Sequence, residues 1–140
     1  MCLFRSSTSI TPTYGTSSTV CSDYGDSSGT QSATATWTTG SSTWTTYTAP
    51  TGVKNVIFII NSITGKNHTY NTITLNINKN GSVVYTGNVD TADANYYNYT
   101  PYLFSTAATA GDKFTITGSI EYRSGKTSYL CFGEIIIIAC

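Results

Sequence analysis

Residues 72–86, which read TITLNINKNGSVVYT, set the fold of this chain. In the first half of the stretch, apolar and polar residues alternate, and the apolar face consists of Ile73, Leu75 and Ile77. A period of two predicts a half-buried strand over residues 72–78, with a wet face of threonine and asparagine. Asn80-Gly81 follows, and this pair favours a type I′ turn because both residues accept positive φ. The stretch therefore predicts a β-hairpin that continues through residues 83–86.

Further strand signals occur on both sides of this hairpin. The predicted strands cover residues 35–39, 43–48, 53–61, 99–105, 113–122 and 128–139. The apolar runs at 56–60 and 135–138 predict strands that are buried on both faces. Gly118 lies on the apolar face of its strand, where it marks a bulge or a close approach. We expect residues 123–126 to close a second hairpin.

The sequence shows no convincing amphipathic helix. Short strands with turns every 8–12 residues are typical of an all-β sandwich or barrel. The alternation along the chain is compatible with two antiparallel sheets packed face to face. We therefore predict an antiparallel, jelly-roll-like β-sandwich.

Composition excludes several classes of protein. The chain has 140 residues with seven basic and seven acidic side chains, and charged residues make up only 10%. Threonine, serine and asparagine contribute 27, 17 and 10 residues, or 54 of the 140. Nucleic-acid binding is disfavoured, because neutralising phosphates requires clustered lysine and arginine. No apolar run approaches the length of a transmembrane helix.

The first 33 residues of the chain differ from the rest in composition. Residues 1–33 are dominated by serine, threonine and glycine, which predicts an extended N-terminal arm, either a simple surface arm or one that docks on a neighbouring subunit. Residues 34–140 then form the β-sandwich domain. The start of the chain, residues 1–6, lacks the apolar region of a signal peptide. Together with the charge-poor surface, this favours an extracellular assembly such as a virion, reached without a signal peptide.

The four cysteines are Cys2, Cys21, Cys131 and Cys140. They allow three pairings, and the sequence does not choose among them. One interpretation is one or two disulfides that tie the N-terminal segment to the last strand. The other, which we favour slightly, is four reduced thiols. Their spacing fits no zinc site.

Two segments carry a family resemblance. Residues 44–56, WTTYTAPTGVKNV, resemble the opening W-T-x-P-x-G-V-x-x-V of many phage tail-fibre and virion surface modules. Residues 75–81 and 110–116, LNINKNG and AGDKFTI, are similar to a rhythm shared by viral surface domains and jelly rolls of the tumour-necrosis-factor and complement type. The resemblance covers residues 44–139 and implies a jelly-roll sandwich, often trimeric, that acts as a head decoration, minor capsid or fibre and receptor-contact module. The glycine-rich stretch and collagen-like stalk of some relatives are absent.

Aromatic residues are the candidate interaction surface. Tyrosine offers flat apolar area and a hydroxyl at little cost in entropy, and tyrosines concentrate in residues 95–102. The candidate contact residues are Tyr96, Tyr97, Tyr99, Tyr102, Trp37 and Trp44. They suit contacts with another subunit or stacking on sugar. The simpler interpretation is that the tyrosines cover the edge of the sandwich and that the tryptophans belong to the core or a subunit interface.

The sequence contains few residues that could act in catalysis or bind a metal. His68 is the only histidine and lies in a polar loop, without a G-x-S-x-G motif in the chain. Glu121 and Glu134 are the only glutamates, and each sits beside strand residues. Oxygen ligands in residues 88–95 match no EF-hand spacing. We expect no enzyme, no cofactor and no bound metal.

The sequence therefore predicts a structural subunit of an extracellular assembly, with a phage virion as the first choice. Its partners would be other assembly proteins and further copies of itself, with a trimer favoured. The alternative is a carbohydrate-binding module that stacks tyrosine and tryptophan on a cell-surface glycan. Neither nucleic acid nor membrane insertion is expected.

Overall fold

The computed structural model describes residues 13–17, 19–24, 29–67, 73–89, 100–122 and 127–140. These ranges hold thirteen strands. The strands are β1 Thr13–Ser17, β2 Thr19–Tyr24, β3 Gly29–Thr34, β4 Trp37–Thr39, β5 Ser42–Trp44, β6 Tyr47–Thr48, β7 Asn55–Asn67, β8 Ile73–Lys79, β9 Ser82–Val89, β10 Thr100–Ala107, β11 Lys113–Tyr122, β12 Thr127–Phe132 and β13 Ile135–Ala139. The described ranges contain no helix with the length and hydropathy needed to cross a bilayer.

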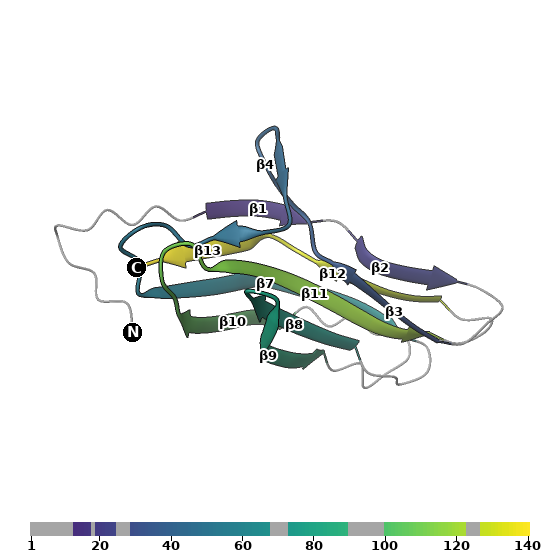
Figure 1. Cartoon of the computed structure of the whole chain (residues 1–140). Helices are drawn as coiled ribbons and strands as arrows, with labels where there is room; N and C mark the ends of the chain where they lie inside the picture. Colours follow the sequence, from purple (N-terminus) through teal and green to yellow (C-terminus); the bar gives the residue numbers. More distant parts are fainter. Residues whose placement is uncertain (1–12, 18, 25–28, 68–72, 90–99, 123–126) are drawn as a thin grey trace.

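The strands form two antiparallel sheets, which confirms the predicted sandwich. The eight-stranded sheet has the order β2-β12-β7-β13-β1-β4-β5, with β10 on the other edge of β7. The five-stranded sheet has the order β3-β11-β8-β9, and β6 pairs with β11 beyond the end of β3. In Figure 1 the long strands β7 and β11 run alongside each other through the middle of the molecule, and the β4 segment rises above it.

The core fills the space between the two sheets. From β7 it takes Val56, Phe58 and Ile60, each at most 2% exposed, and Phe58 meets Phe114 of β11 with ring centroids 5.2 Å apart. The remaining buried residues continue this alternation along the neighbouring strands. They include Leu75, Ile77, Ile116, Ile120, Leu130, Phe132, Ile135 and Ile137. Burial of alternate residues from both sheets produces the single apolar layer of a sandwich.

The two apolar runs are covered on one face only, which corrects the prediction of burial on both. In residues 56–60, Ile57 and Ile59 are partly exposed although their neighbours are buried. In residues 135–138, Ile136 and Ile138 are partly exposed in the same way. Both strands lie in the eight-stranded sheet, whose outer face carries no second layer of described strands. Continuous hydrophobicity here reflects an apolar outer face rather than a strand inside a three-layer fold.

The described part of residues 13–33 belongs to the sheets. β1 pairs with β13, β2 pairs with β12, and β3 pairs with β11 along six residues. The sandwich therefore begins at β1 rather than at Thr34. Composition assigns these serine- and threonine-rich segments to an arm, but their backbones pair with strands of both sheets. Residues 1–12 lie outside the described residues.

Two predictions about the later strands were wrong. Residues 123–126 lie outside the described residues, and the strands on either side of them do not pair with each other: β11 belongs to the five-stranded sheet, whereas β12 pairs with β2 and β7 in the other sheet. The predicted last strand, residues 128–139, is divided into β12 and β13 at Gly133 and Glu134. At Gly118 the pairing of β11 with β8 proceeds without a register shift, so no bulge lies there, and the alternative of a close approach stays a prediction.

The predicted hairpin at the centre of the sequence is confirmed. β8 and β9 are joined at Asn80 and Gly81, which have φ of 51° and 85° as a type I′ turn requires. Gly111, in the turn between β10 and β11, also has a positive φ of 87°. These two turns lie side by side at the same end of the sandwich. The backbone N–H of Asn80 donates to the Lys113 carbonyl at 2.8 Å.

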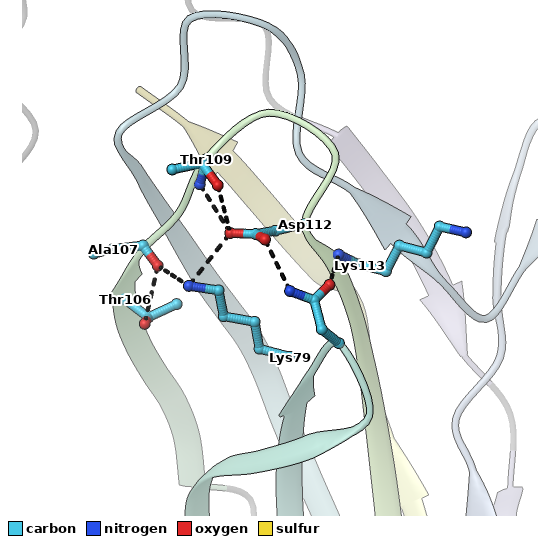
Figure 2. Close-up of polar contacts among 7 residues, drawn as sticks. Lys79, Thr106, Ala107, Thr109, Asp112 and Lys113 are labelled. Atoms are coloured by element: carbon cyan, nitrogen blue, oxygen red, sulfur yellow. Dashed lines mark hydrogen bonds and ion pairs between the residues drawn. The ribbon is translucent and has the colours of Figure 1, made fainter.

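A polar clasp of Lys79, Asn80, Thr109 and Asp112 joins these turns (Figure 2). One Asp112 oxygen, Oδ2, accepts the Thr109 backbone N–H at 2.8 Å, and Oδ1 accepts the Asn80 amide at 2.8 Å. The Lys79 ammonium lies 3.3 Å from Asp112 Oδ2. Hydrogen bonds from Thr109 and Asn80, followed by the Lys79 contact, lower the pKa of Asp112 from 3.8 to about 2.

Because of the clasp, the free energy of unfolding should change with pH in the acid range. Since folding lowers the pKa of Asp112, its contribution is complete above the unfolded pKa of 3.8 and disappears as the pH falls through about 2. We expect Asp112→Ala to lower the free energy of unfolding at pH 7, and the gap to wild type to close between about pH 4 and pH 2. Urea unfolding of both proteins across this range measures the gap. A gap that keeps its full size at the lowest pH would contradict this role.

Candidate functional site

The outer face of the five-stranded sheet carries a regular array of neutral polar side chains. Register aligns these side chains in two rows that each cross four strands, β3, β11, β8 and β9. One row is Thr34, Thr117, Asn76 and Thr86, and the other is Ser32, Ser119, Thr74 and Asn88. These eight residues are named the hydroxyl grid. All eight are partly or fully exposed, whereas the alternate residues of β8 and β11 are buried in the core.

Hydrogen bonds between neighbours hold the hydroxyl grid in place. The Thr86 hydroxyl donates to Asn76 Oδ1 at 2.7 Å, and the Ser32 hydroxyl donates to Ser119 Oγ at 3.1 Å. Asn78 continues the array and donates to Thr117 Oγ1 at 3.4 Å. Cross-strand bonds of this kind restrict side-chain rotation, so the groups present themselves to a ligand with less entropy left to lose.

The chemistry of the grid suits a neutral ligand rich in hydroxyl groups. Each threonine or serine hydroxyl donates one hydrogen bond and accepts others, and each asparagine amide does both. The groups repeat about every 4.8 Å across the strands and about every 6.7 Å along them. No member of the grid ionises, so a ligand displaces water from uncharged groups only, which costs less than displacing it from ions.

The two tryptophans lie on the β4–β5 hairpin, and both side chains make contacts within the protein. Trp37 is 1% exposed, and its ring stacks between Trp44 at 5.4 Å and Phe132 at 6.2 Å. The Trp37 indole N–H donates to the Gly133 carbonyl at 3.3 Å. Trp44 is half-buried, and its own N–H donates to Thr39 Oγ1 at 3.2 Å. Trp37 is therefore a core residue, and Trp44 is the tryptophan that retains exposed surface.

Tyr102 closes the edge of the sandwich. It is half-buried on β10, and its hydroxyl donates to the Asn88 carbonyl at 2.6 Å. A Cβ added at Gly87 would lie 2.7 Å from Tyr102 Cε1, so this contact requires glycine. Burial, followed by the neighbouring Tyr85, raises the pKa of Tyr102 above 10.0. Its ring thus packs β10 against β9.

Several other sequence candidates fall outside the described residues. They are Tyr96, Tyr97 and Tyr99, together with His68 and the oxygen ligands of residues 90–95. Glu121 and Glu134 are exposed and lie on different sheets, Glu121 at the end of β11 and Glu134 at the break before β13. Among the described ranges, no group of three histidine, cysteine or acidic residues could hold a metal ion.

The cysteines are in different states. Cys140 is disulfide-bonded, whereas Cys131 of β12 retains its thiol. The structure thus departs from the favoured expectation of four reduced thiols. The backbone of Cys21 pairs with Leu130, and Cys2 lies outside the described residues.

Sequence reasoning found the polar face of β8 but not the site that it belongs to. Alternation within residues 72–78 indicates a wet face of threonine and asparagine, and the same period appears in β11. The rows exist only because β3, β11, β8 and β9 align in register across long separations in sequence. A single sequence holds no direct signal for that alignment, whereas the aromatic residues of 95–102 are visible in one local segment.

The edge role of Tyr102 leads to a test of stability. Tyr102→Phe removes the hydrogen bond to Asn88, and we expect it to lower the free energy of unfolding by about 1 kcal/mol. Gly87→Ala forces a Cβ into the ring and should cost about 1–3 kcal/mol. Chemical denaturation measures both changes. If Tyr102→Phe retains full stability but alters ligand binding, Tyr102 is a contact residue instead.

Comparison by sequence finds no relatives. No protein-family model matches the chain, and no curated protein matches it.

Comparison by structure finds proteins of similar architecture. Dimeric latent PorU from Porphyromonas gingivalis aligns with 93% of this chain at a TM-score of 0.53 and 7% identity, and the chain spans 12% of PorU. The CBM36-1 domain of a multidomain xylanase from the hindgut metagenome of Trinervitermes trinervoides aligns with 90% of this chain and over 96% of its own length, at a TM-score of 0.43 and 10% identity. The EclA C-terminal domain, a sugar-binding protein, aligns with 98% of this chain and over 82% of its own length, at a TM-score of 0.42 and 12% identity. The likeness to PorU shows the β-sandwich fold alone.

Proposed function

We propose that this protein is a carbohydrate-binding module that holds neutral glycans on the hydroxyl grid. The observation that carries the proposal is the pair of four-strand rows, in which eight neighbouring outward positions are all threonine, serine or asparagine. One of the similar structures, the EclA C-terminal domain, is a sugar-binding protein, but the proposal rests on the grid and not on that low-scoring alignment.

Recognition would proceed by hydrogen bonding across a shallow face. Sugar hydroxyls exchange hydrogen bonds with the central side chains Asn76 and Thr117, while threonine methyl groups contact the apolar faces of the sugar rings. Each such hydrogen bond contributes about 0.5–1.5 kcal/mol after exchange with water. Several are needed for useful affinity, so an extended oligosaccharide that covers both rows fits better than a single sugar.

The absence of charge within the grid favours neutral over acidic glycans. The grid contains neither lysine nor arginine to pair with a carboxylate or sulfate, and Glu121 is paired in register with Thr30 one step beyond the second row. A carboxylate or sulfate would therefore gain no ion pair within the grid. The module should therefore select neutral polysaccharides.

Near-isosteric substitution within the grid tests this function. Thr117→Val and Thr74→Val remove one hydroxyl each and retain a residue suited to strands. We expect each to weaken binding of the best neutral ligand from a glycan array by about tenfold, as loss of about 1.4 kcal/mol implies. Thr45→Val, at an exposed threonine beyond β5, is the matched control and should bind as wild type does.

Two further outcomes decide the proposal. Affinity should stay constant between about pH 5 and pH 9, because no grid side chain titrates there. The proposal fails if the array shows no binding, or if Trp44→Ala abolishes binding while both valine variants retain it. The latter result would place sugar recognition on the β4–β5 hairpin.

A second candidate function is that of a structural subunit in an extracellular assembly. The titles of the similar structures reported above name no virion protein. The observation that favours a subunit role is the apolar outer face of the eight-stranded sheet. This face is independent of the hydroxyl grid, so the two functions are compatible in one molecule.

A further inference from the structure

Asn80 and Gly81 form the only Asn-Gly pair in the sequence, and they make the turn of the β8–β9 hairpin. The pair of Lys79 with Ser82 is the last in the ladder, so Gly81 lies beyond the paired positions. Asn80 is exposed, and a Cβ built on Gly81 would meet no atom within 4 Å. Solvent therefore surrounds the peptide bond that follows Asn80.

An asparagine followed by glycine is chemically labile, because glycine has no side chain to hinder attack by its backbone nitrogen. In that reaction a bond forms between Gly81 N and Asn80 Cγ, the bond from Cγ to Nδ2 breaks, and ammonia leaves with the proton of the Gly81 N–H. Water then opens the five-membered imide and leaves a carboxylate at position 80. The sum of the steps is hydrolysis of one amide, so neither an oxidant nor a reductant takes part.

The polar clasp holds both ends of the Asn80 amide. Asn80 Nδ2 donates to Asp112 Oδ1 at 2.8 Å, and Asn80 Oδ1 accepts the backbone N–H of Lys113 at 2.9 Å. The imide forms only when the side chain turns back over its own peptide bond toward Gly81. In the clasp the side chain instead reaches across to the start of β11, so the closed clasp opposes the reaction.

We propose that Asn80 is a deamidation site whose rate is set by the clasp. While the clasp is closed, the amide stays bound to Asp112 and Lys113 and is protected. Each local opening of the clasp releases the amide to attack by Gly81, as local opening exposes other groups that a closed state protects. Because ammonia is lost, the change is irreversible and accumulates with the time that the clasp spends open.

The product does not fit the clasp. A carboxylate oxygen in place of Nδ2 would stand 2.8 Å from Asp112 Oδ1 if nothing moved, without a hydrogen between the two atoms. Two carboxylates this close oppose each other's ionisation. The Lys79 ammonium lies 3.3 Å from Asp112 and already donates to the Ala107 carbonyl at 3.0 Å (Figure 2). Deamidation should therefore loosen the contact between the two turns.

Peptide mass spectrometry of the full chain during incubation at neutral pH measures conversion at Asn80. We expect folded wild type to react at least about tenfold more slowly than the chain unfolded in guanidinium chloride. Folded Asp112→Ala should react about tenfold faster than folded wild type, because loss of a hydrogen bond to a charged group shifts the opening equilibrium by about that factor. Tyr102→Phe is the matched control: it weakens the contact of β10 with β9, leaves the clasp intact and should react as wild type does.

The variant Asn80→Asp tests the consequence for the fold. Asp-Gly favours the same type I′ turn as Asn-Gly, so the hairpin itself is retained. At neutral pH the urea midpoint of Asn80→Asp should fall below that of wild type and approach that of Asp112→Ala. Circular dichroism verifies that both variants fold.

Four results would overturn the inference. Equal rates in folded and unfolded wild type, or no conversion in either, would show that the clasp does not protect a labile amide. An unchanged rate in Asp112→Ala would exclude control by the clasp, and equal acceleration by Asp112→Ala and Tyr102→Phe would assign the reaction to general unfolding. An Asn80→Asp midpoint equal to that of wild type would show that the product still fits the clasp.

Discussion

The contact between Phe58 of β7 and Phe114 of β11 is the one on which the structure depends. It joins the central strands of the two sheets, with ring centroids 5.2 Å apart in the middle of the core. Because side chains alternate along a strand, fixing these two residues inward fixes the direction of every neighbour on both strands. A slip of one residue would turn Ile116 and Ile60 outward and expose the core.

The two outer faces follow from the same constraint. On β11 the residues between the buried ones are threonine and serine, and with β3, β8 and β9 they form the hydroxyl grid. On β7 the residues between the buried ones are the partly exposed Ile57 and Ile59, which pair in register with aliphatic residues of β10 and β13. The sandwich thus has a neutral polar outer face on one sheet and aliphatic side chains on the outer face of the other.

Sequence patterns predicted the elements whose structure is determined by residues close together in the chain. The alternation of residues 73–77 and the Asn80-Gly81 turn give β8, β9 and their hairpin directly. Pairing between distant segments was harder to predict. β1, β2 and β3 look like a polar arm by composition, but they pair with β13, β12 and β11, whose residues lie 83 to 124 positions away in the sequence. The hydroxyl grid was not predicted for the same reason, because it exists only where four strands align. Of the aromatic candidates that the structure describes, Trp37 and Tyr102 pack internally and Trp44 retains exposed surface, whereas Tyr96, Tyr97 and Tyr99 lie outside the described residues.

Chemical-shift mapping tests the central claim that the neutral outer face of β3, β11, β8 and β9 holds the ligand. A neutral oligosaccharide selected by array is titrated into the isotopically labelled protein, and backbone amide shifts are followed. The account predicts that the largest shifts fall at grid positions such as Thr74, Asn76 and Thr117, with little change along β7 and β13. Shifts that concentrate on the isoleucines of β7 and β13, or around Trp44, would contradict it.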